Sequence, residues 1–443
     1  MKQVLAFVLY NSLLSIFLLV DFSKWLMFVL QNKLGRVNEN QQKRDNQWAQ
    51  KFGFGPFNTE PVDLIIHCAS VGEVASVMPL LQQLCLDSDK FKILVTTNTL
   101  TGKHQLFRLL DQLGLHAQIQ HRYLPIDLPW LLKPMLRKCK PKLFVIMEVE
   151  LWPNLIINCK KQDIPLVVIN ARMTDKTKTG YSKLSWLAQP MLQSISHTYT
   201  RNDGDTQNYQ QLGVEDKKLS LVGNIKFDIE QPSQPIAEKL RHTLNLQQRQ
   251  VLIGGSTHEG EEALLLECYL NLKHIFPNLI LLIAPRHPHR FDLVNAFLIE
   301  NKMNVARMSL DQEVSEKTDI LLADEMGKLS SLYGVGDIVF VGGSFVKVGG
   351  HNPIEAAAFG KPILMGQYIY NNPEIINTLA NDGGLDIISD KIAFIDSVKR
   401  LLSEPEYMAE KGNKALLTVQ NNSGVLAKLK QGITEFLNHE KRI

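Results

Sequence analysis

The residues with the most evident chemistry lie in the segment 336–374. An apolar run at 338–341 predicts a buried strand, and a helix is predicted from 352 to 360. Between them come Gly349, Gly350, His351 and Asn352. The first turn of a helix leaves backbone N–H groups unpaired and carries the positive end of the helix dipole. Because glycine lets an anion approach closely, these four residues are predicted to cradle a phosphate.

Glu355 follows one turn into the same predicted helix. An acidic side chain in this place can accept hydrogen bonds from the two hydroxyls of a ribose, as acidic residues do in dinucleotide folds. Together with the glycines it favours a nucleotide-activated donor. The alternative is that the glycines only shape tight turns and that Glu355 is a solvated helix residue.

A second carboxylate with a candidate role is Glu73. The run His67-Cys-Ala-Ser-Val-Gly-Glu73 predicts a strand end, a turn of small residues and the start of a helix, with Glu73 facing the cleft. Partial burial would raise its pKa towards neutrality and suit it to deprotonate an alcohol. The equal alternative is that Glu73 only satisfies free N–H groups at the start of the helix.

Other turns of the first half carry polar side chains that could bind an acceptor or orient neighbours. Glu148 and Glu150 are two residues apart after a predicted strand, and two carboxylates cannot both be buried there without partners. Each therefore orients neighbours or touches a polar ligand. The full set of candidate acceptor-binding or orienting residues is Ser70, Thr97, Glu148, Glu150 and Arg172.

Three turns of the second half add candidate donor-binding groups. Lys226, in GNIKFD, and Arg286, in PRHP, are cations that could neutralise a leaving phosphate. Ser256 and Thr257 offer hydroxyls and N–H groups at another predicted helix start. His287 joins this set through its place beside Arg286, although a single histidine is more often a packed residue than a catalyst.

Composition and charge narrow the class of protein. A chain of 443 residues exceeds one ordinary core, which predicts two domains, and a net charge of +3 is too small to indicate nucleic-acid binding. The five cysteines form no CxxC pair and predict free thiols. Asp87 and Asp89 have the DxD form of a metal-nucleotide site, but they sit between a helix and a strand, so a solvated turn and no metal are expected.

The N-terminus differs from the rest of the chain. Residues 4–20 are almost wholly apolar and 25–30 extend the run, which predicts a retained membrane anchor over 1–31. Basic residues after this stretch place the following domain in the cytoplasm. The charges of Asp21 and Lys24 leave a helix lying in the membrane interface as the alternative.

From residue 62 onwards, short apolar runs alternate with amphipathic stretches. This alternation predicts parallel sheets covered on both faces, and thus an α/β chain of two Rossmann-like, doubly wound lobes. The pattern loosens into a charged, proline-bearing seam at 215–235. We expect an N-terminal lobe over 32–218, a C-terminal lobe over 219–443, and a ligand cleft at the carboxyl ends of their strands.

Eight motifs in order resemble the 3-deoxy-D-manno-octulosonic acid (Kdo) transferases that build the inner core of lipopolysaccharide. The resemblance covers nearly the whole chain, and the motifs are CASVGE, TTNTLTG, MEVELWPN, NARM, GNIKFD, GSTHEGEE, APRHPHRF and VGGSFVKVGGHNPIEAAAFGKPILMG.

The resemblance implies a glycosyltransferase-B fold and an inverting transfer from CMP-Kdo to the lipid A precursor at the cytoplasmic face of the inner membrane. It implies that Glu73 is the general base and that Arg286, the GGHN turn and Glu355 hold CMP. Two alternatives stay open: another nucleotide-sugar enzyme of this fold, such as a hexosamine transferase or an epimerase, and a membrane-anchored binding protein without turnover.

Overall fold

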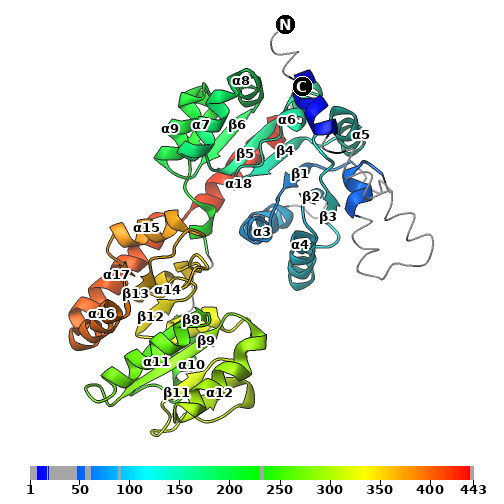
Figure 1. Ribbon diagram of the computed structural model, residues 1–443. Coiled ribbons are helices and arrows are strands. Elements are labelled where there is room, and N and C mark those ends of the chain that lie inside the picture. The colour runs from blue at the N-terminus through cyan, green and yellow to red at the C-terminus, as the bar shows by residue number, and fades with distance from the viewer. Residues whose placement is uncertain are drawn as a thin grey trace. The chain divides into compact units, whose positions relative to one another are not determined.

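The computed structural model describes residues 7–16, 18, 47–54, 61–87, 91–229 and 234–439. Contacts divide the chain into two compact units. Unit 1 comprises residues 1–225 and 424–443, and unit 2 comprises residues 226–423. Each unit is built on one sheet with helices on both of its faces (Figure 1).

Unit 1 contains seven parallel strands in the order β3-β2-β1-β4-β5-β6-β7. Their bounds are β1 Leu64–His67, β2 Ile93–Thr97, β3 Ile119–Tyr123, β4 Leu143–Met147, β5 Leu166–Ala171, β6 His197–Thr200 and β7 Leu219–Leu221. The helices are α3 Val71–Leu86, α4 Leu100–Leu113, α5 Pro129–Cys139, α6 Pro153–Lys161, α7 Asp175–Lys183, α8 Ser185–Gln193, α9 Asp203–Gln211 and α18 Val425–His439.

Unit 2 repeats this architecture, with parallel strands in the order β10-β11-β9-β8-β12-β13-β14. Its strands are β8 Gln250–Thr257, β9 Leu279–Pro285, β10 Val305–Arg307, β11 Ile320–Leu322, β12 Ile338–Val341, β13 Ile363–Gly366 and β14 Leu385–Ile388. The helices are α10 Gln234–Thr243, α11 Glu261–Leu272, α12 Phe291–Glu300, α13 Leu329–Val335, α14 Ile354–Ala358, α15 Pro373–Asn381, α16 Lys391–Ser403 and α17 Pro405–Asn421, with short 3-10 turns η2 Ile225–Phe227 and η3 Pro288–Arg290.

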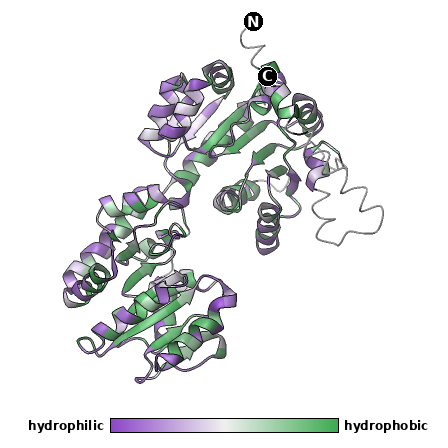
Figure 2. Cartoon of the chain, viewed as in Figure 1, coloured by the Kyte–Doolittle hydropathy of each residue, from purple (hydrophilic) through white to green (hydrophobic). Residues whose placement is uncertain are grey.

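The apolar runs form central strands because both faces of each sheet are covered. In β1, Leu64 and Ile66 pack with α3, α4 and α18, whereas Ile65 between them packs with the helices of the opposite face. Most of the central strands are apolar, and the outer helix faces are largely polar (Figure 2). The predicted pair of doubly wound α/β lobes is confirmed.

The expected domain limits need two corrections. β7 pairs with β6, so residues 219–225 belong to unit 1. Residues 424–443 also return to unit 1, where α18 contacts α3 and β4. The chain passes from unit 1 to unit 2 between Ile225 and Lys226, inside the seam predicted at 215–235.

The predicted anchor over 1–31 falls largely outside the described residues. Its described part, residues 7–16, is helical, and Tyr10 of this helix donates a hydrogen bond of 2.9 Å to Asp127. Among the described residues, none of the helices has the length and apolar character needed to span a membrane.

In each sheet the strand order reverses between two central neighbours, β1 and β4 in unit 1 and β8 and β12 in unit 2. Ligands of open α/β sheets bind outside the carboxyl ends of the strands at such a reversal. The loops after these four strands are therefore the places to look for a site, and they hold most of the residues that the sequence singled out.

Candidate functional site

Glu73 lies in the first turn of α3, directly after the carboxyl end of β1. Ser70 caps the helix and accepts the backbone N–H of Glu73 at 3.3 Å. The Glu73 carboxylate in turn accepts the Ala69 N–H and the Ser70 hydroxyl, both at 2.9 Å. The side chain is only 8% exposed. The capping role that the sequence left open is therefore present, and Ser70 orients Glu73.

Burial also changes the acidity of Glu73. The pKa of Glu73 is raised to about 7. Desolvation is the largest cause, the charges of Glu148 and Glu150 act in the same direction, and the hydrogen bonds from Ala69 and Ser70 oppose the shift. A carboxyl group with a pKa near neutrality can both lose and accept a proton at physiological pH. Glu73 can thus both accept hydrogen bonds at the start of α3 and act as a base.

Glu150 follows β4 and has a contrasting environment. Its Oε2 accepts the Trp152 indole N–H at 2.9 Å and the Asn98 amide at 3.2 Å, and His67 Nε2 lies 3.8 Å away. The contacts with His67, Trp152 and Asn98 lower the pKa of Glu150 against the effect of its burial. This side chain therefore stays ionised while Glu73 titrates.

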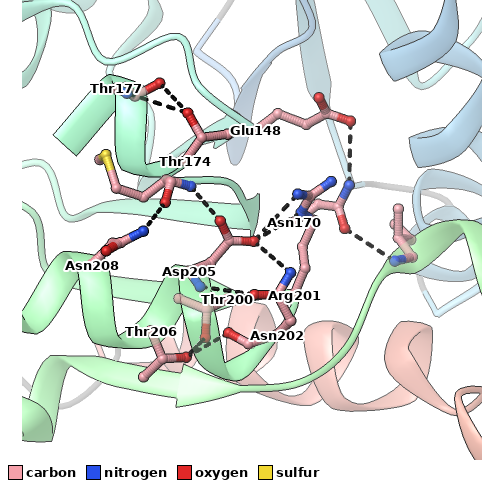
Figure 3. Close-up of polar contacts among 12 residues, drawn as sticks. Glu148, Asn170, Thr174, Thr177, Thr200, Arg201, Asn202, Asp205, Thr206 and Asn208 are labelled. Atoms are coloured by element: carbon pink, nitrogen blue, oxygen red, sulfur yellow. Dashed lines mark hydrogen bonds and ion pairs between the residues drawn. The ribbon is translucent and has the colours of Figure 1, made fainter. Parts of the chain in front are cut away.

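Glu148 and Asn170 stand at the ends of neighbouring strands, β4 and β5, and both have positive φ angles, 54° and 50°. Residues other than glycine hold such a conformation only where their surroundings impose it, often at functional sites. Asn170 donates its amide to Glu148 at 3.3 Å and accepts the backbone N–H of Ile225 at 3.1 Å (Figure 3). Asn170 thus joins a site carboxylate to the last residue of unit 1 before the crossing.

A buried ion pair supports the turn after β5. Asp205 accepts the backbone N–H of Met173 at 2.6 Å and pairs with Arg201 and Asn202 (Figure 3). Sequence reasoning missed this set; its only local signal is Asn202, a residue that favours helix caps and here caps α9. Arg172, in the supported turn, is half-buried and donates its backbone N–H to the Glu148 carbonyl at 3.4 Å.

Thr97 does not join the carboxylates. Its hydroxyl bonds His121 Nε2 at 2.9 Å, on the neighbouring strand β3, and the Thr99 carbonyl at 3.3 Å. In this structure the Thr97 hydroxyl orients His121, and a role for it in binding an acceptor stays a prediction.

The glycine turns of unit 2 require a larger correction. The backbone N–H groups of Gly349 and Gly350 donate to the Gly343 carbonyl at 3.0 and 2.7 Å, and that of His351 donates to the Gly342 carbonyl at 3.1 Å. The helix that follows, α14, has only five residues and begins at Ile354. The predicted backbone cradle for a phosphate is wrong at these three groups, because the two glycine turns bind each other.

The turn after β8 also differs from its prediction. β8 continues through Ser256 and Thr257, and α11 begins only at Glu261, so neither residue starts a helix. Ser256 has a φ of 53°, and the Thr257 hydroxyl donates to the carboxylate of Glu262 at 2.9 Å. Glu262 also pairs with Arg290 at 2.6 Å.

Side chains, rather than backbone groups, converge in unit 2. His258 Nε2 and His351 Nε2 lie 2.8 Å apart, and the rings of His258 and His287 are 5.4 Å apart. Desolvation by burial, followed by the charge of Arg286, lowers the pKa of His351 to about 4. The structure thereby brings together three residues that the sequence predicted, Arg286, His287 and His351, and adds His258.

Glu355 belongs to the same region. Burial raises its pKa, a hydrogen bond with Ser330 opposes the shift, and its charge acts on Tyr333, as does that of Arg286. The side chain of Asn352 caps the backbone N–H of Ile354 at 3.2 Å. Lys226 lies on η2, the first residue of unit 2 after the crossing.

The described residues contain no cluster of three or more histidine, cysteine or acidic side chains that could hold a metal ion. Of the DxD pair, Asp87 ends α3 and binds Lys430 at 2.9 Å, whereas Asp89 lies outside the described residues.

The geometry therefore offers a poised carboxyl group in unit 1 and a cationic, histidine-rich site in unit 2. Residues 46–229 match the family model described as 3-deoxy-D-manno-octulosonic-acid transferase (kdotransferase), and residues 263–416 match that of the glycosyl transferases group 1. The 3-deoxy-D-manno-octulosonic acid transferase of Haemophilus influenzae is 35% identical over 401 residues, which cover 89% of this chain and 92% of that protein. The chain belongs to the Kdo transferase family.

The chain has two further similarities, one in sequence and one in fold. The Kdo transferase of Bordetella pertussis is 30% identical over 77% of this chain and 79% of that protein. Among solved structures, UDP-GlcNAc 2-epimerase from Neisseria meningitidis is similar over 84% of this chain and 99% of that chain, with a TM-score of 0.55 and 14% identity. The structural similarity shows the fold alone, and the family membership makes the chain a glycosyltransferase.

Proposed function

We propose that this Kdo transferase family member moves Kdo from CMP-Kdo to the lipid A precursor, lipid IVA, with inversion at the anomeric carbon. The observation that carries the proposal is Glu73: a buried carboxyl group at the strand-order reversal of unit 1, with its pKa raised to about 7. Such a group can serve as the single base that an inverting transfer requires.

In the proposed reaction, an acceptor hydroxyl attacks the anomeric carbon of Kdo and the bond to the CMP phosphate breaks. Glu73 takes the hydroxyl proton, and the electron pair of the broken bond leaves with CMP. Negative charge grows on the phosphate oxygen. Arg286 carries a permanent positive charge, which can stabilise such a developing charge. We assign to Arg286, His287, His351 and Glu355 the binding of the donor, with His258 as an added member.

The proposal includes no metal or other cofactor. Arg286, which is charged at any physiological pH, would supply the positive charge that a metal ion supplies in other nucleotide-sugar enzymes. A chelator is accordingly expected to leave transfer unchanged, and loss of transfer in EDTA that Mg²⁺ restores would contradict this part.

We also propose that unit 1 rests on the cytoplasmic face of the inner membrane through the helix at 7–16. Tyr10 and Asn11 of this helix bind the protein, through Asp127 and Asn154. Leu9, Leu13 and Ile16 are 52%, 60% and 63% exposed and recur at helical spacing, which places them on one face. An exposed apolar helix face of this kind inserts into the boundary between lipid head groups and acyl chains.

The experiment that tests the function incubates the full chain with CMP-Kdo and lipid IVA and counts the added sugars by mass. We expect a mass increase of one or more Kdo units, no increase with UDP-N-acetylglucosamine as donor, and loss of transfer in Glu73→Gln. Glu435→Gln, at an exposed site on α18, is the matched control. No mass shift with CMP-Kdo and lipid IVA would overturn the proposal.

The membrane part is tested by flotation of the full chain with vesicles of phosphatidylethanolamine and phosphatidylglycerol. Leu13→Glu places a charge on the exposed helix face and is expected to reduce flotation, whereas Leu417→Glu, on an exposed face of α17, is not. Equal flotation of both variants would exclude the helix face as the contact.

A further inference from the structure

Three side chains converge on one oxygen of Glu150. Asn98 reaches Oε2 from the loop after β2 at 3.2 Å, and the Trp152 indole reaches it at 2.9 Å. His67, the last residue of β1, places Nε2 3.8 Å from the same oxygen. Charged acceptors form the stronger hydrogen bonds, so the Asn98 and Trp152 donors hold the carboxylate in one orientation, with the His67 ring beside it.

His67 is itself held at both ring nitrogens. It is fully buried, and its Nδ1 lies 2.9 Å from the Thr96 hydroxyl on β2, while Nε2 also lies 3.4 Å from the Asn98 amide. Rotating the ring would break both contacts. The imidazole ring therefore has one orientation beside Glu150, which is fixed by contacts between the neighbouring strands β1 and β2 and the loop after β2.

The second oxygen of Glu150 is in a different position. Within the described ranges, no hydrogen bond joins Oε1 to another residue, and the side chain of Glu150 is 23% exposed. A carboxylate fastened through one oxygen and open at the other can accept a hydrogen bond from a ligand without losing its own orientation.

We propose that His67, Asn98 and Trp152 are positioning residues that fix Glu150 through Oε2 and leave Oε1 to accept a hydrogen bond from a hydroxyl or amide N–H of the sugar acceptor. The inference rests on the proposed function, in which unit 1 binds the acceptor, and assigns to these residues the orientation of the acceptor beside Glu73. Glu150 orients the sugar and Glu73 takes its proton.

The acidities of the two carboxyl groups support this division. Burial raises the pKa of Glu73 to about 7, whereas the contacts with His67, Trp152 and Asn98 lower that of Glu150. Two carboxyl groups whose environments separate their pKa values in this way take different roles in one site. Glu150 remains an ionised acceptor of hydrogen bonds across the range in which Glu73 gains and loses its proton.

The kinetic test compares His67→Asn and Trp152→Phe with two matched controls in the same unit. His197→Asn changes a β6 histidine that bonds the Ser220 hydroxyl at 2.9 Å, and Trp186→Phe changes an exposed tryptophan of α8. For His67→Asn and Trp152→Phe, kcat/KM for lipid IVA is expected to fall about tenfold to hundredfold, because the group that orients the acceptor is displaced. The KM for CMP-Kdo is expected to stay unchanged. Unchanged acceptor kinetics, or an equal loss for the donor, would overturn the inference.

A second measurement does not depend on turnover. In the full chain labelled with ¹⁵N-tryptophan, the indole resonance of Trp152 is assigned by its loss in Trp152→Phe. Glu150→Gln and His67→Asn are expected to shift this resonance, and His197→Asn is not. If the wild-type protein transfers no Kdo, the proposed function fails, but the resonance still tests whether Glu150 is positioned by Trp152 and His67. An unshifted resonance in Glu150→Gln refutes this positioning even when transfer is normal.

Discussion

Glu73 combines two tasks that usually oppose each other. As a residue of the first helical turn it accepts hydrogen bonds from Ala69 and Ser70, which favour its charged form, and as a buried group it loses hydration, which favours its neutral form. Desolvation is the larger effect, and the neighbouring carboxylates add to it. The net result is a carboxyl group that is held rigidly by its cap and titrates near neutral pH.

The pH dependence of transfer follows from this shift. Because Glu73 must be ionised to take a proton, kcat/KM is expected to rise with pH through about 7 and to level off above it. Initial rates measured across that range provide the check, with Glu73→Gln expected to lose about a hundredfold or more and to lose the acidic limb. An acidic limb near the ordinary glutamate pKa would show that Glu73 is not the base.

The same shift has a consequence for stability. The pKa of Glu73 is higher in the folded chain than in the unfolded chain, so the folded state binds more protons between the two values and stability falls as pH rises through this window. Glu73→Gln is expected to increase the free energy of unfolding by about 1–3 kcal/mol above pH 7, with no gain below the unfolded pKa. Denaturant unfolding above pH 7 and below the unfolded pKa measures the change in the free energy of unfolding, with Glu435→Gln as the control. An equal gain in stability at the two pH values would show that the gain comes from packing and not from titration of Glu73.

At the scale of elements, the start of α11 organises the loops of unit 2. The fully buried Glu261 accepts the N–H groups of Gly343 at 2.8 Å, of Ser344 and Phe345 at 3.0 Å each, and of His258 at 2.9 Å. A protein carboxylate thus occupies the backbone N–H groups of the turn after β12, which precedes the turn at 349–352 where a ligand phosphate was expected. The adjacent residue, Glu262, fixes the loop that follows β9 through its ion pair with Arg290.

Replacing this carboxylate tests the arrangement. Glu261→Gln leaves one oxygen and turns an amide group towards backbone donors, so the free energy of unfolding is expected to fall by about 2–4 kcal/mol and the KM for CMP-Kdo to rise. Glu267→Gln, further along α11 and paired with Lys391 at the surface, is the control and should change neither quantity measurably. If Glu261→Gln changed neither the free energy of unfolding nor the KM for CMP-Kdo, the turns would be stable without the carboxylate.

At the scale of the whole molecule, the chain crosses between the units twice. Ile225 is buried in a core of unit 1 and Phe227 in a core of unit 2, with Lys226 between them. On the return, Val419 belongs to a core of unit 2 and Val425 to a core of unit 1. Unit 1 is therefore completed only by the last segment of the chain, α18, which packs against the first helix of the sheet, α3.

Shortening a side chain of α18 should accordingly weaken unit 1. Leu429 is fully buried in that core, and Leu429→Ala is expected to cost about 2–5 kcal/mol, whereas the half-exposed Leu417→Ala on α17 should cost far less. Denaturant unfolding gives the cost, and hydrogen exchange gives its place, with faster exchange expected in peptides of α3 and β4. Exchange that accelerates only in peptides of unit 2 would contradict this assignment of α18.

The sequence by itself determined the central strands, the seam between the units and the position of Glu73 at a helix start, because continuous apolar runs and small-residue turns are local signals. It did not reveal β3, β10 or β14, since strands at or next to the edge of a sheet are short or partly polar. Only the tertiary structure decided which partners occupy the glycine N–H groups, how Glu150 is held, and where α18 returns. These outcomes depend on contacts between residues far apart in the chain, which no local pattern of residues encodes.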